Sequence, residues 1–209
     1  YKPIIIVAGE PNSIFLEIYF KSIFQKKFKS PIILIASKKL IKLQMERLKF
    51  KKKIKLLKLT DLNVSKLNNK SINLIDVAYH QTKAFEKISK KSNNYIWKSF
   101  KIAFEIIKKG ISKKLINGPI SKKHFLNKKY PGITEFISEQ FLCQKNAMLI
   151  YNKNLSVCPI TTHLPLKNVS RNITKKKIIE KTKLINFFYK TKFKKKPKIA
   201  ITGLNPHCE

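Results

Sequence analysis

The sequence predicts an α/β protein with three layers (α/β/α), in which helices cover both faces of a mixed, mostly parallel sheet. Short β-branched runs occupy residues 3–8 (PIIIVA) and 31–36 (PIILIA) and have the length and composition of buried strands, and residues 53–59 are expected to form a third strand. Segments with helical periodicity separate these runs. Because a strand–helix–strand order brings successive strands into parallel pairing, this alternation is typical of sheets with helices on both faces.

Turn and capping residues mark the expected elements of the N-terminal half. The expected strands are residues 3–8, 31–36 and 53–59, and the expected helices are residues 14–24, 38–49 and 77–109, the last with a break near residues 90–94. Asn12 or Ser13 is the expected N-cap of the first helix, and Ser37 that of the second, because short polar side chains accept hydrogen bonds from free amides. The asparagine-rich residues 61–71 predict a loop. Gly110 is expected to end the long helix.

The C-terminal half is predicted to continue the alternation of strands and helices. The expected elements are a strand at residues 114–117, a helix at 135–142, strands at 147–151 and 155–160, a helix at 175–189 and a last strand at 198–202. The tight turn at residues 152–154 favours an antiparallel hairpin. No clean linker divides the chain. The N-terminal block of alternating strands and helices and the region from about Lys114 onward are nevertheless candidates for two lobes.

The composition is that of a globular chain. Hydrophobic residues make up 43% of 209 residues, which is enough for a buried core. No apolar run approaches the ~20 residues of a membrane span, and no signal-peptide pattern opens the chain. Cys143, Cys158 and Cys208 form no C-x-x-C pair, which favours reduced thiols and a cytoplasmic location.

The net charge of +35 has two interpretations. Such a charge is typical of nucleic-acid binders. Lysine supplies nearly all of it, however, with Arg47 and Arg171 as the only arginines, and arginine is the residue that forks onto guanine and phosphate. Because the lysines are spread along the chain, the compositional bias of an AT-rich genome is the favoured explanation. A non-catalytic, basic nucleic-acid-binding protein remains an alternative.

Two histidines follow predicted strands and suggest a metal site. His163 lies just after the strand at residues 155–160, and His207 lies after the strand at residues 198–202. The helix at residues 175–189 would connect these strands as a crossover, so both histidines would lie at the carboxyl edge of one sheet. Two imidazoles there can bind a divalent metal. A catalytic zinc usually takes three protein ligands, so a third must come from elsewhere; merely exposed loop histidines are the alternative.

Two glycine-containing loops are candidates for anion binding. Residues 117–122 (NGPISK) follow a strand and open a helix, where a helix N-terminus and Lys122 can hold an anion. Residues 131–135 (PGITE) form a similar turn before a helix. Residues 9–11 (GEP) lack the G-x-G-x-x-G pattern, so no dinucleotide site is predicted there.

In order and spacing, these segments resemble the 4-hydroxythreonine-4-phosphate dehydrogenase family of vitamin B6 biosynthesis. The motifs that carry the resemblance are PIIIVAGEPNSIFLEI, NGPISK, PGITEF, TTHLPLKNVSRNIT and GLNPH. The resemblance implies a two-lobed fold akin to isocitrate and isopropylmalate dehydrogenases, and a homodimer. Residues 1–209 would be the N-terminal two thirds of one such two-lobed dehydrogenase.

The resemblance also implies roles for residues of this chain. His163 and His207 correspond to two of three histidines that hold a divalent metal (zinc, magnesium or cobalt), and the third lies in a later segment. Lys122 matches a lysine near the cleft that helps to position substrate. Thr134 and Ile133 stand where the family has a substrate-binding His-Thr pair. NAD is bound mainly by the later part of the family's chain, so no cofactor-binding residue is named.

The implied reaction is the NAD-dependent oxidation of 4-phosphooxy-L-threonine to a β-keto acid, which decarboxylates to 3-amino-2-oxopropyl phosphate. Ile133 departs from the family's G-H-T-E pattern because it replaces a histidine. This departure keeps open a second activity, the oxidation of another phosphorylated four-carbon hydroxy acid.

Overall fold

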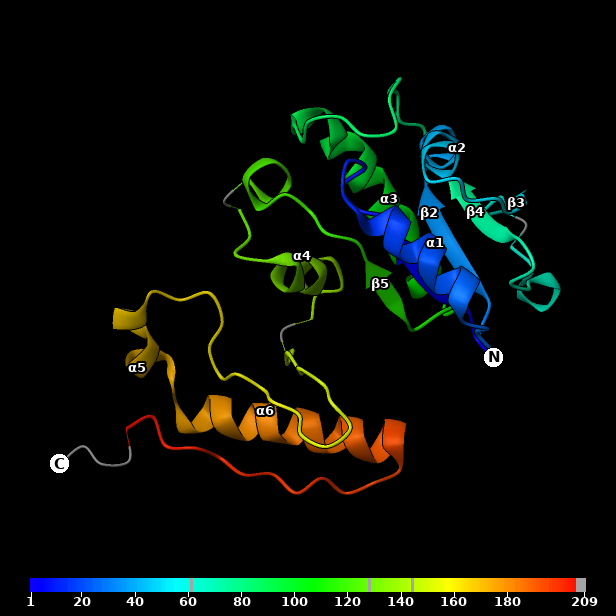
Figure 1. Cartoon of the computed structure of the whole chain (residues 1–209). Helices are drawn as coiled ribbons and strands as arrows, with labels where there is room; N and C mark the ends of the chain where they lie inside the picture. The colour runs from blue at the N-terminus through cyan, green and yellow to red at the C-terminus, as the bar shows by residue number, and fades with distance from the viewer. Residues whose placement is uncertain (61, 128, 144, 206–209) are drawn as a thin grey trace. The chain divides into compact units, whose positions relative to one another are not determined.

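A computed structural model of the chain describes residues 1–60, 62–127, 129–143 and 145–205 (Figure 1). The chain forms two compact units, unit 1 at Tyr1–Lys129 and unit 2 at Tyr130–Glu209.

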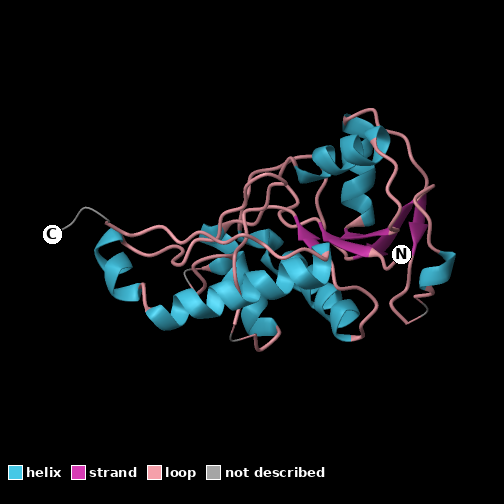
Figure 2. Ribbon diagram, turned by 90° about the horizontal axis from the view of Figure 1, so that it is seen from below, coloured by secondary structure: helices cyan, strands magenta, loops and turns pink. Residues whose placement is uncertain are grey.

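Unit 1 is built on a five-stranded sheet in which every pairing is parallel. Its strands are β1 (Ile4–Val7), β2 (Ile32–Ala36), β3 (Ile54–Leu56), β4 (Ile72–Asp76) and β5 (Leu115–Asn117), in the order β3-β4-β2-β1-β5. The sheet forms a layer between helices (Figure 2). The predicted α/β class is therefore confirmed, and so are the four expected strands of this region, although the third is only three residues long.

Three α-helices cover the two faces of this sheet. They are α1 (Phe15–Gln25), α2 (Lys38–Arg47) and α3 (Asn93–Lys108), and the short helical turns are η1 (Val64–Lys66), η2 (Lys90–Ser92) and η3 (Lys122–Leu126). Phe20 of α1 and Ile41 of α2 pack with Leu34 and Leu74 on one face. Because side chains alternate across a strand, Ile33 and Ile35 point to the opposite face, where α3 packs against β1 and β2.

The helix predicted from Val77 to Lys109 was wrong in its first part. Residues 72–76 form strand β4, and no helix occurs over residues 77–89. Buried Asn73 interrupts the apolar run of this strand, and its side-chain amide donates to the carbonyls of Ile32 (3.0 Å) and Asn68 (2.7 Å). These bonds satisfy the side-chain NH2 group of Asn73, a residue that the sequence pattern alone would keep out of a buried strand.

The capping predictions had mixed outcomes. Ser37 caps α2 as predicted, since its hydroxyl accepts from the Leu40 amide at 3.3 Å. The N-cap of α1 is Ile14 rather than Asn12 or Ser13, although the Ser13 hydroxyl does accept from the Phe15 amide. Gly110 follows α3 with a φ of +71°, the conformation expected of a glycine that ends a helix.

The regular secondary structure in the described part of unit 2 consists of helices and one isolated bridge. Its helices are α4 (Ile133–Gln140), α5 (Val169–Asn172) and α6 (Lys175–Phe188), with the short turns η4 (Leu166–Asn168) and η5 (Tyr189–Phe193). Helix α6 confirms the helix expected at residues 175–189, and the hydroxyl of Thr174 accepts from the Lys177 amide at its start. No helix in the described ranges has the length and apolar character that crossing a membrane requires.

Two strand predictions in unit 2 were wrong in extent or altogether. The hairpin at residues 147–160 is reduced to one antiparallel bridge, in which Ile150 and Val157 exchange two backbone hydrogen bonds of 2.8 and 3.0 Å. Residues 198–202 form no strand, and Ile201 remains 62% exposed. A strand needs a neighbour for its amides and carbonyls, and the described residues offer this segment none.

Candidate functional site

The carboxyl ends of β1 and β5 meet at one edge of the unit 1 sheet. The Gly118 amide donates to the carbonyl of Val7 and the Glu10 amide donates to the carbonyl of Pro119, both at 2.8 Å. Gly118 is required at this position because a Cβ there would collide with the backbone carbonyl of Ala8. The NGPISK and GEP loops are thereby joined where parallel α/β sheets place their ligands.

A buried carboxylate lies beside this junction. Glu10 is 3% exposed. Its two side-chain oxygens accept from the Ser92 hydroxyl at 2.9 Å and from the backbone amide of Asn12 at 3.4 Å. The side chain of Asn12 in turn accepts from the Glu86 amide at 2.9 Å. Burial raises the pKa of the Tyr79 phenol, and the negative charges of Glu10 and Glu86 raise this pKa further.

Lys122 lies at the start of η3, immediately after this edge, with its side chain exposed. The hydroxyl of Ser121 accepts from the His124 amide at 3.2 Å and caps the turn. The predicted helix is thus only a five-residue turn, too short to act as a strong helix dipole. The substrate-positioning role of Lys122 stays a prediction that rests on its charge and its place after β5.

In unit 2 the PGITE segment opens α4. Gly132 is the N-cap, and Ile133, Thr134 and Glu135 form the first turn. The three first-turn residues are only partly buried. Phe136 anchors this turn, being 3% exposed and in edge-to-face contact with Tyr130 at a centroid distance of 5.4 Å.

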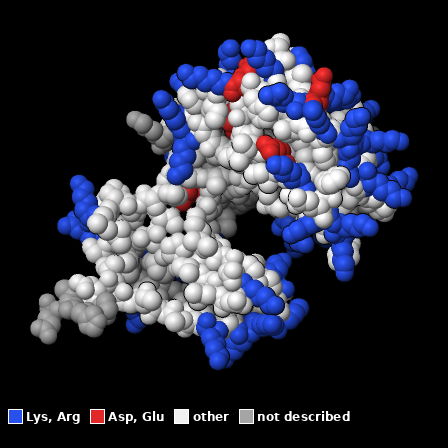
Figure 3. Space-filling view, viewed as in Figure 1, with Lys and Arg blue, Asp and Glu red and all other residues white. Residues whose placement is uncertain are grey.

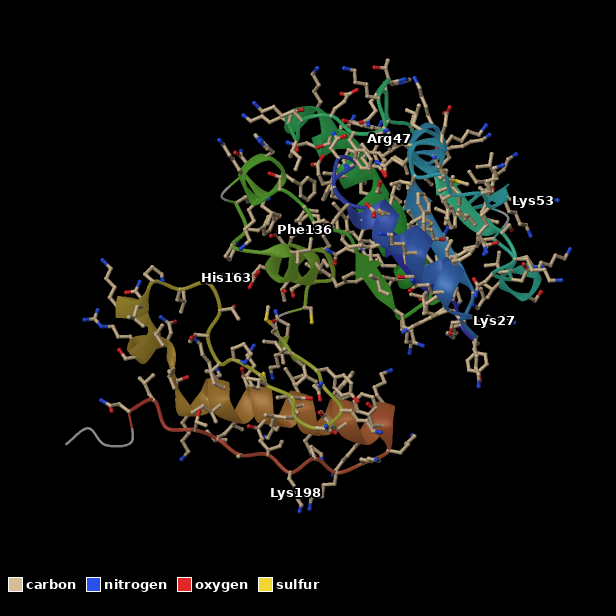
Figure 4. All side chains as sticks on the ribbon, in the orientation of Figure 1. Lys27, Arg47, Lys53, Phe136, His163 and Lys198 are labelled. Carbon is tan, nitrogen blue, oxygen red and sulfur yellow. The ribbon has the colours of Figure 1, made fainter. Side chains whose placement is uncertain are left out.

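His163 lies beside the start of α4 (Figure 4). Its backbone has a φ of +56°, a left-handed conformation that histidine adopts more readily than most residues. Pro165 follows two residues later and restricts Leu164 to extended conformations. The turn in TTHLPL therefore presents an exposed imidazole at a defined place.

The imidazole of His163 and the carboxylate of Glu135 approach the same face of Gly132. A Cβ built on Gly132 would lie 2.9 Å from Oε2 of Glu135 and 3.1 Å from Nε2 of His163. Oε2 of Glu135 is also shielded from solvent and has no hydrogen-bond partner among the residues that the structure describes. A nitrogen ligand and an oxygen acceptor without a partner fit the surroundings of a divalent cation.

The structure places only one of the two predicted metal ligands. His207 lies outside the described residues. The strand expected at residues 198–202 is absent, so the crossover argument for bringing His207 next to His163 has no support from the described backbone. Within the described ranges, no group of three His, Cys, Asp or Glu side chains is close enough to hold a metal ion. The two-histidine metal site stays a prediction.

Glu10 and Glu135 received no role from sequence reasoning, although both lie in motifs that it singled out. Glu10 directly follows Gly9, and Glu135 lies three residues after Gly132 in the first turn of α4. An acidic residue in or just after a glycine-containing turn is a signal that could have identified them. On the face shown in Figure 3, Lys and Arg side chains are scattered over unit 1 and do not gather over a single element.

Comparison with known proteins assigns the chain to a family. The model of "pyridoxal phosphate biosynthetic protein PdxA" matches residues 27–209. A 4-hydroxythreonine-4-phosphate dehydrogenase of Sulfurihydrogenibium sp. (strain YO3AOP1) is 36% identical over 216 aligned positions, which cover 97% of this chain and 63% of the relative. A D-threonate 4-phosphate dehydrogenase of Salmonella typhimurium is 23% identical to this chain. The alignment covers 99% of this chain and 64% of that relative.

The fold also matches a solved structure. A Salmonella typhimurium chain assigned as a 4-hydroxythreonine-4-phosphate dehydrogenase superposes with a TM-score of 0.83 at 22% identity, over 99% of this chain and 65% of that chain. The protein thus spans somewhat less than two thirds of the length of these relatives. On the match of residues 27–209, the chain belongs to the PdxA family of pyridoxal phosphate biosynthetic proteins.

Proposed function

We propose that the protein is an NAD- and metal-dependent dehydrogenase that oxidises 4-phosphooxy-L-threonine in vitamin B6 biosynthesis. The family match over residues 27–209 carries this proposal, and the Sulfurihydrogenibium relative bears the name of that activity. The reaction removes a hydride from the carbon that bears the hydroxyl group and passes it to NAD. The resulting β-keto acid loses CO2 and gives 3-amino-2-oxopropyl phosphate.

The chain's own residues would bind and orient the substrate. His163 together with His207 would hold a divalent metal, which when bound lowers the pKa of a coordinated hydroxyl group. Thr134 is partly buried at the N-terminal turn of α4, where its hydroxyl can donate a hydrogen bond to substrate. The exposed ammonium group of Lys122 suits the anionic phosphate or carboxylate of the substrate.

An assay of NADH formation tests this proposal. The full-length protein is given NAD, 4-phosphooxy-L-threonine and one of zinc, magnesium or cobalt. We expect NADH to appear in a metal-dependent manner and to stop when a chelator is added. No turnover with any of the three metals would contradict the proposal.

A second candidate substrate is another phosphorylated four-carbon hydroxy acid. Ile133 removes an imidazole from the substrate-binding turn, and one relative is named for D-threonate 4-phosphate. That compound carries a hydroxyl group where 4-phosphooxy-threonine carries an amine. Comparing kcat/KM for the two compounds decides between them, because the physiological substrate should be favoured by at least about 10-fold, or ~1.4 kcal/mol.

The net charge of +35 motivates the remaining alternative, a basic nucleic-acid-binding protein. Such a protein would bind DNA or RNA with an affinity that falls steeply with salt concentration. We expect no binding at moderate salt.

We also propose that the protein is a cytoplasmic homodimer, as the family resemblance implies, and light scattering would show twice the mass of the chain.

A further inference from the structure

The buried carboxylate oxygen of Glu135 points to a further role for this residue. Oε2 is shielded from solvent and has no hydrogen-bond partner among the described residues, although Glu135 is the third residue of α4. A buried acceptor without a partner destabilises the folded state, and more so when it is charged. Such groups in native proteins usually face a hydrogen-bond donor or an ion.

The imidazole of His163 approaches Gly132 from the same side as this oxygen. Both Oε2 of Glu135 and Nε2 of His163 lie within 3.1 Å of the point where a Cβ on Gly132 would stand. The absence of a side chain at Gly132 is therefore what lets the carboxylate and the imidazole approach the same place. No direct hydrogen bond joins the two side chains in the part of the chain that the structure describes.

We propose that Glu135 is a positioning residue for the metal site. Its carboxylate accepts the Nε2–H of His163, directly or through one water, and thereby leaves Nδ1 of the imidazole to face the metal. Histidines that bind metals commonly donate their second ring N–H to a carboxylate, which sets the tautomer and the orientation of the ring. The inference rests on the proposed function, because it requires His163 to bind a metal.

The surroundings of Glu135 suit this role. Phe136, the next residue, is buried and packs against Tyr130, so the first turn of α4 is anchored. Gly132 has a φ of −161°, an extended conformation open to any residue. A larger residue at position 132 would therefore disturb Glu135 and His163 through its side chain, without straining the backbone.

A purely structural role for Glu135 makes a different prediction. An acidic residue in the first turn of a helix, such as Glu135 in α4, interacts favourably with the helix dipole. Its loss would then lower the melting temperature slightly and leave metal binding unchanged. Metal affinity therefore separates the two roles.

The experiment is a titration of the metal-free protein with Co²⁺, followed by calorimetry and by the visible absorption of the bound ion. The variants are Glu135→Gln, which keeps the shape and removes the charge, and Gly132→Ala, which adds a methyl group between the two side chains. Glu139→Gln is the control, an exposed carboxylate on the same helix. Circular dichroism checks that each variant is folded.

We expect the Kd for Co²⁺ to rise about 10–100-fold in Glu135→Gln and in Gly132→Ala, and to stay within about 2-fold in Glu139→Gln. If Glu135→Gln fails to fold, Gly132→Ala decides alone. An unchanged Kd in the folded variants overturns this inference and leaves the proposed function standing. No binding of Co²⁺ by the unaltered protein overturns the metal site itself and this inference with it.

Discussion

Gly9 and Gly118 pack backbone to backbone where strands β1 and β5 end. A Cβ on Gly9 would lie 2.9 Å from the carbonyl oxygen of Gly118, and a Cβ on Gly118 would collide with the carbonyl of Ala8. Gly9 also has a φ of +74°, which side chains disfavour. The loops that contain Gly9 and Gly118 therefore lie closer together than residues with side chains would allow. This close approach positions Glu10 and the start of the turn that contains Lys122.

Replacing Gly118 by alanine should destabilise unit 1 strongly. The added methyl group meets backbone atoms, which cannot rotate away, so we expect a loss of about 3 kcal/mol of unfolding free energy. Urea unfolding followed by the fluorescence of Trp97, the only tryptophan and a residue of α3, measures it. Gly110→Ala is the control: nothing lies within 4 Å of its Cβ, so only the left-handed backbone costs about 1 kcal/mol. Equal effects of the two changes would contradict this packing.

Ser92→Ala should destabilise the same unit for an electrostatic reason. The hydroxyl of Ser92 donates to the buried carboxylate of Glu10 at 2.9 Å, and its loss leaves one oxygen short of a donor. We expect a cost of about 1–3 kcal/mol by the same urea measurement. The exposed Ser65→Ala should change stability by less than about 0.5 kcal/mol. A cost for Ser92→Ala no larger than for Ser65→Ala would show that Glu10 is satisfied in another way.

Much of unit 1 could be predicted because its strands are unbroken apolar runs. All five residues of β2 are buried, so its sequence IILIA contains the whole signal. Strand β4 was missed because Asn73 and Asp76 interrupt the run. Both are accommodated by long-range hydrogen bonds, from Asn73 to the carbonyl of Ile32 and from the amide of Lys38 to Asp76 at 2.7 Å. Such partners cannot be read from local sequence.

The candidate site was predictable only in part for the same reason. The place of His163 after a turn could be read from the motif TTHLPL, and the turn residues Ile133 and Thr134 from PGITE. The approach of Glu135 and His163 to the same side of Gly132 joins segments about thirty residues apart. Sequence periodicity carries no information on that contact.

The two described cysteines should differ in reactivity. Partial burial raises the pKa of the Cys158 thiol, an effect that the positive charge of Lys181 opposes, whereas Cys143 is exposed. Only the thiolate reacts with iodoacetamide. Because its pKa lies above the ordinary value of 9.0, Cys158 holds less thiolate than an ordinary cysteine at pH 8, and its labelling rate should keep rising beyond pH 9. Peptide mass spectrometry should show Cys143 modified first; faster labelling of Cys158 would contradict its burial.

His163→Asn should separate metal binding from folding. Asparagine tolerates the left-handed backbone of position 163 as well as histidine does, so the melting temperature of the metal-free protein should change little. The imidazole is lost, however, and the Kd for Co²⁺ should rise by more than about 100-fold, beyond the cost of losing a supporting residue. His80→Asn, an exposed histidine of unit 1, is the control. Unchanged cobalt affinity in His163→Asn would remove His163 from the metal site.

Ile133→His should change the activity by restoring a hydrogen-bond donor to the first turn of α4. Ile133 is only partly buried, so an imidazole can be accommodated there without a cavity or a clash in the core. A hydrogen bond to a charged substrate group contributes about 1.5–3 kcal/mol, so kcat/KM for the preferred phosphorylated substrate should rise about 10-fold or more. Ile137→His, one turn further along the same helix and also partly buried, is the matched control and should give no gain. A decrease in kcat/KM with Ile133→His alone would instead mean that the substrate places an apolar group against this residue, which would favour a substrate other than 4-phosphooxy-L-threonine.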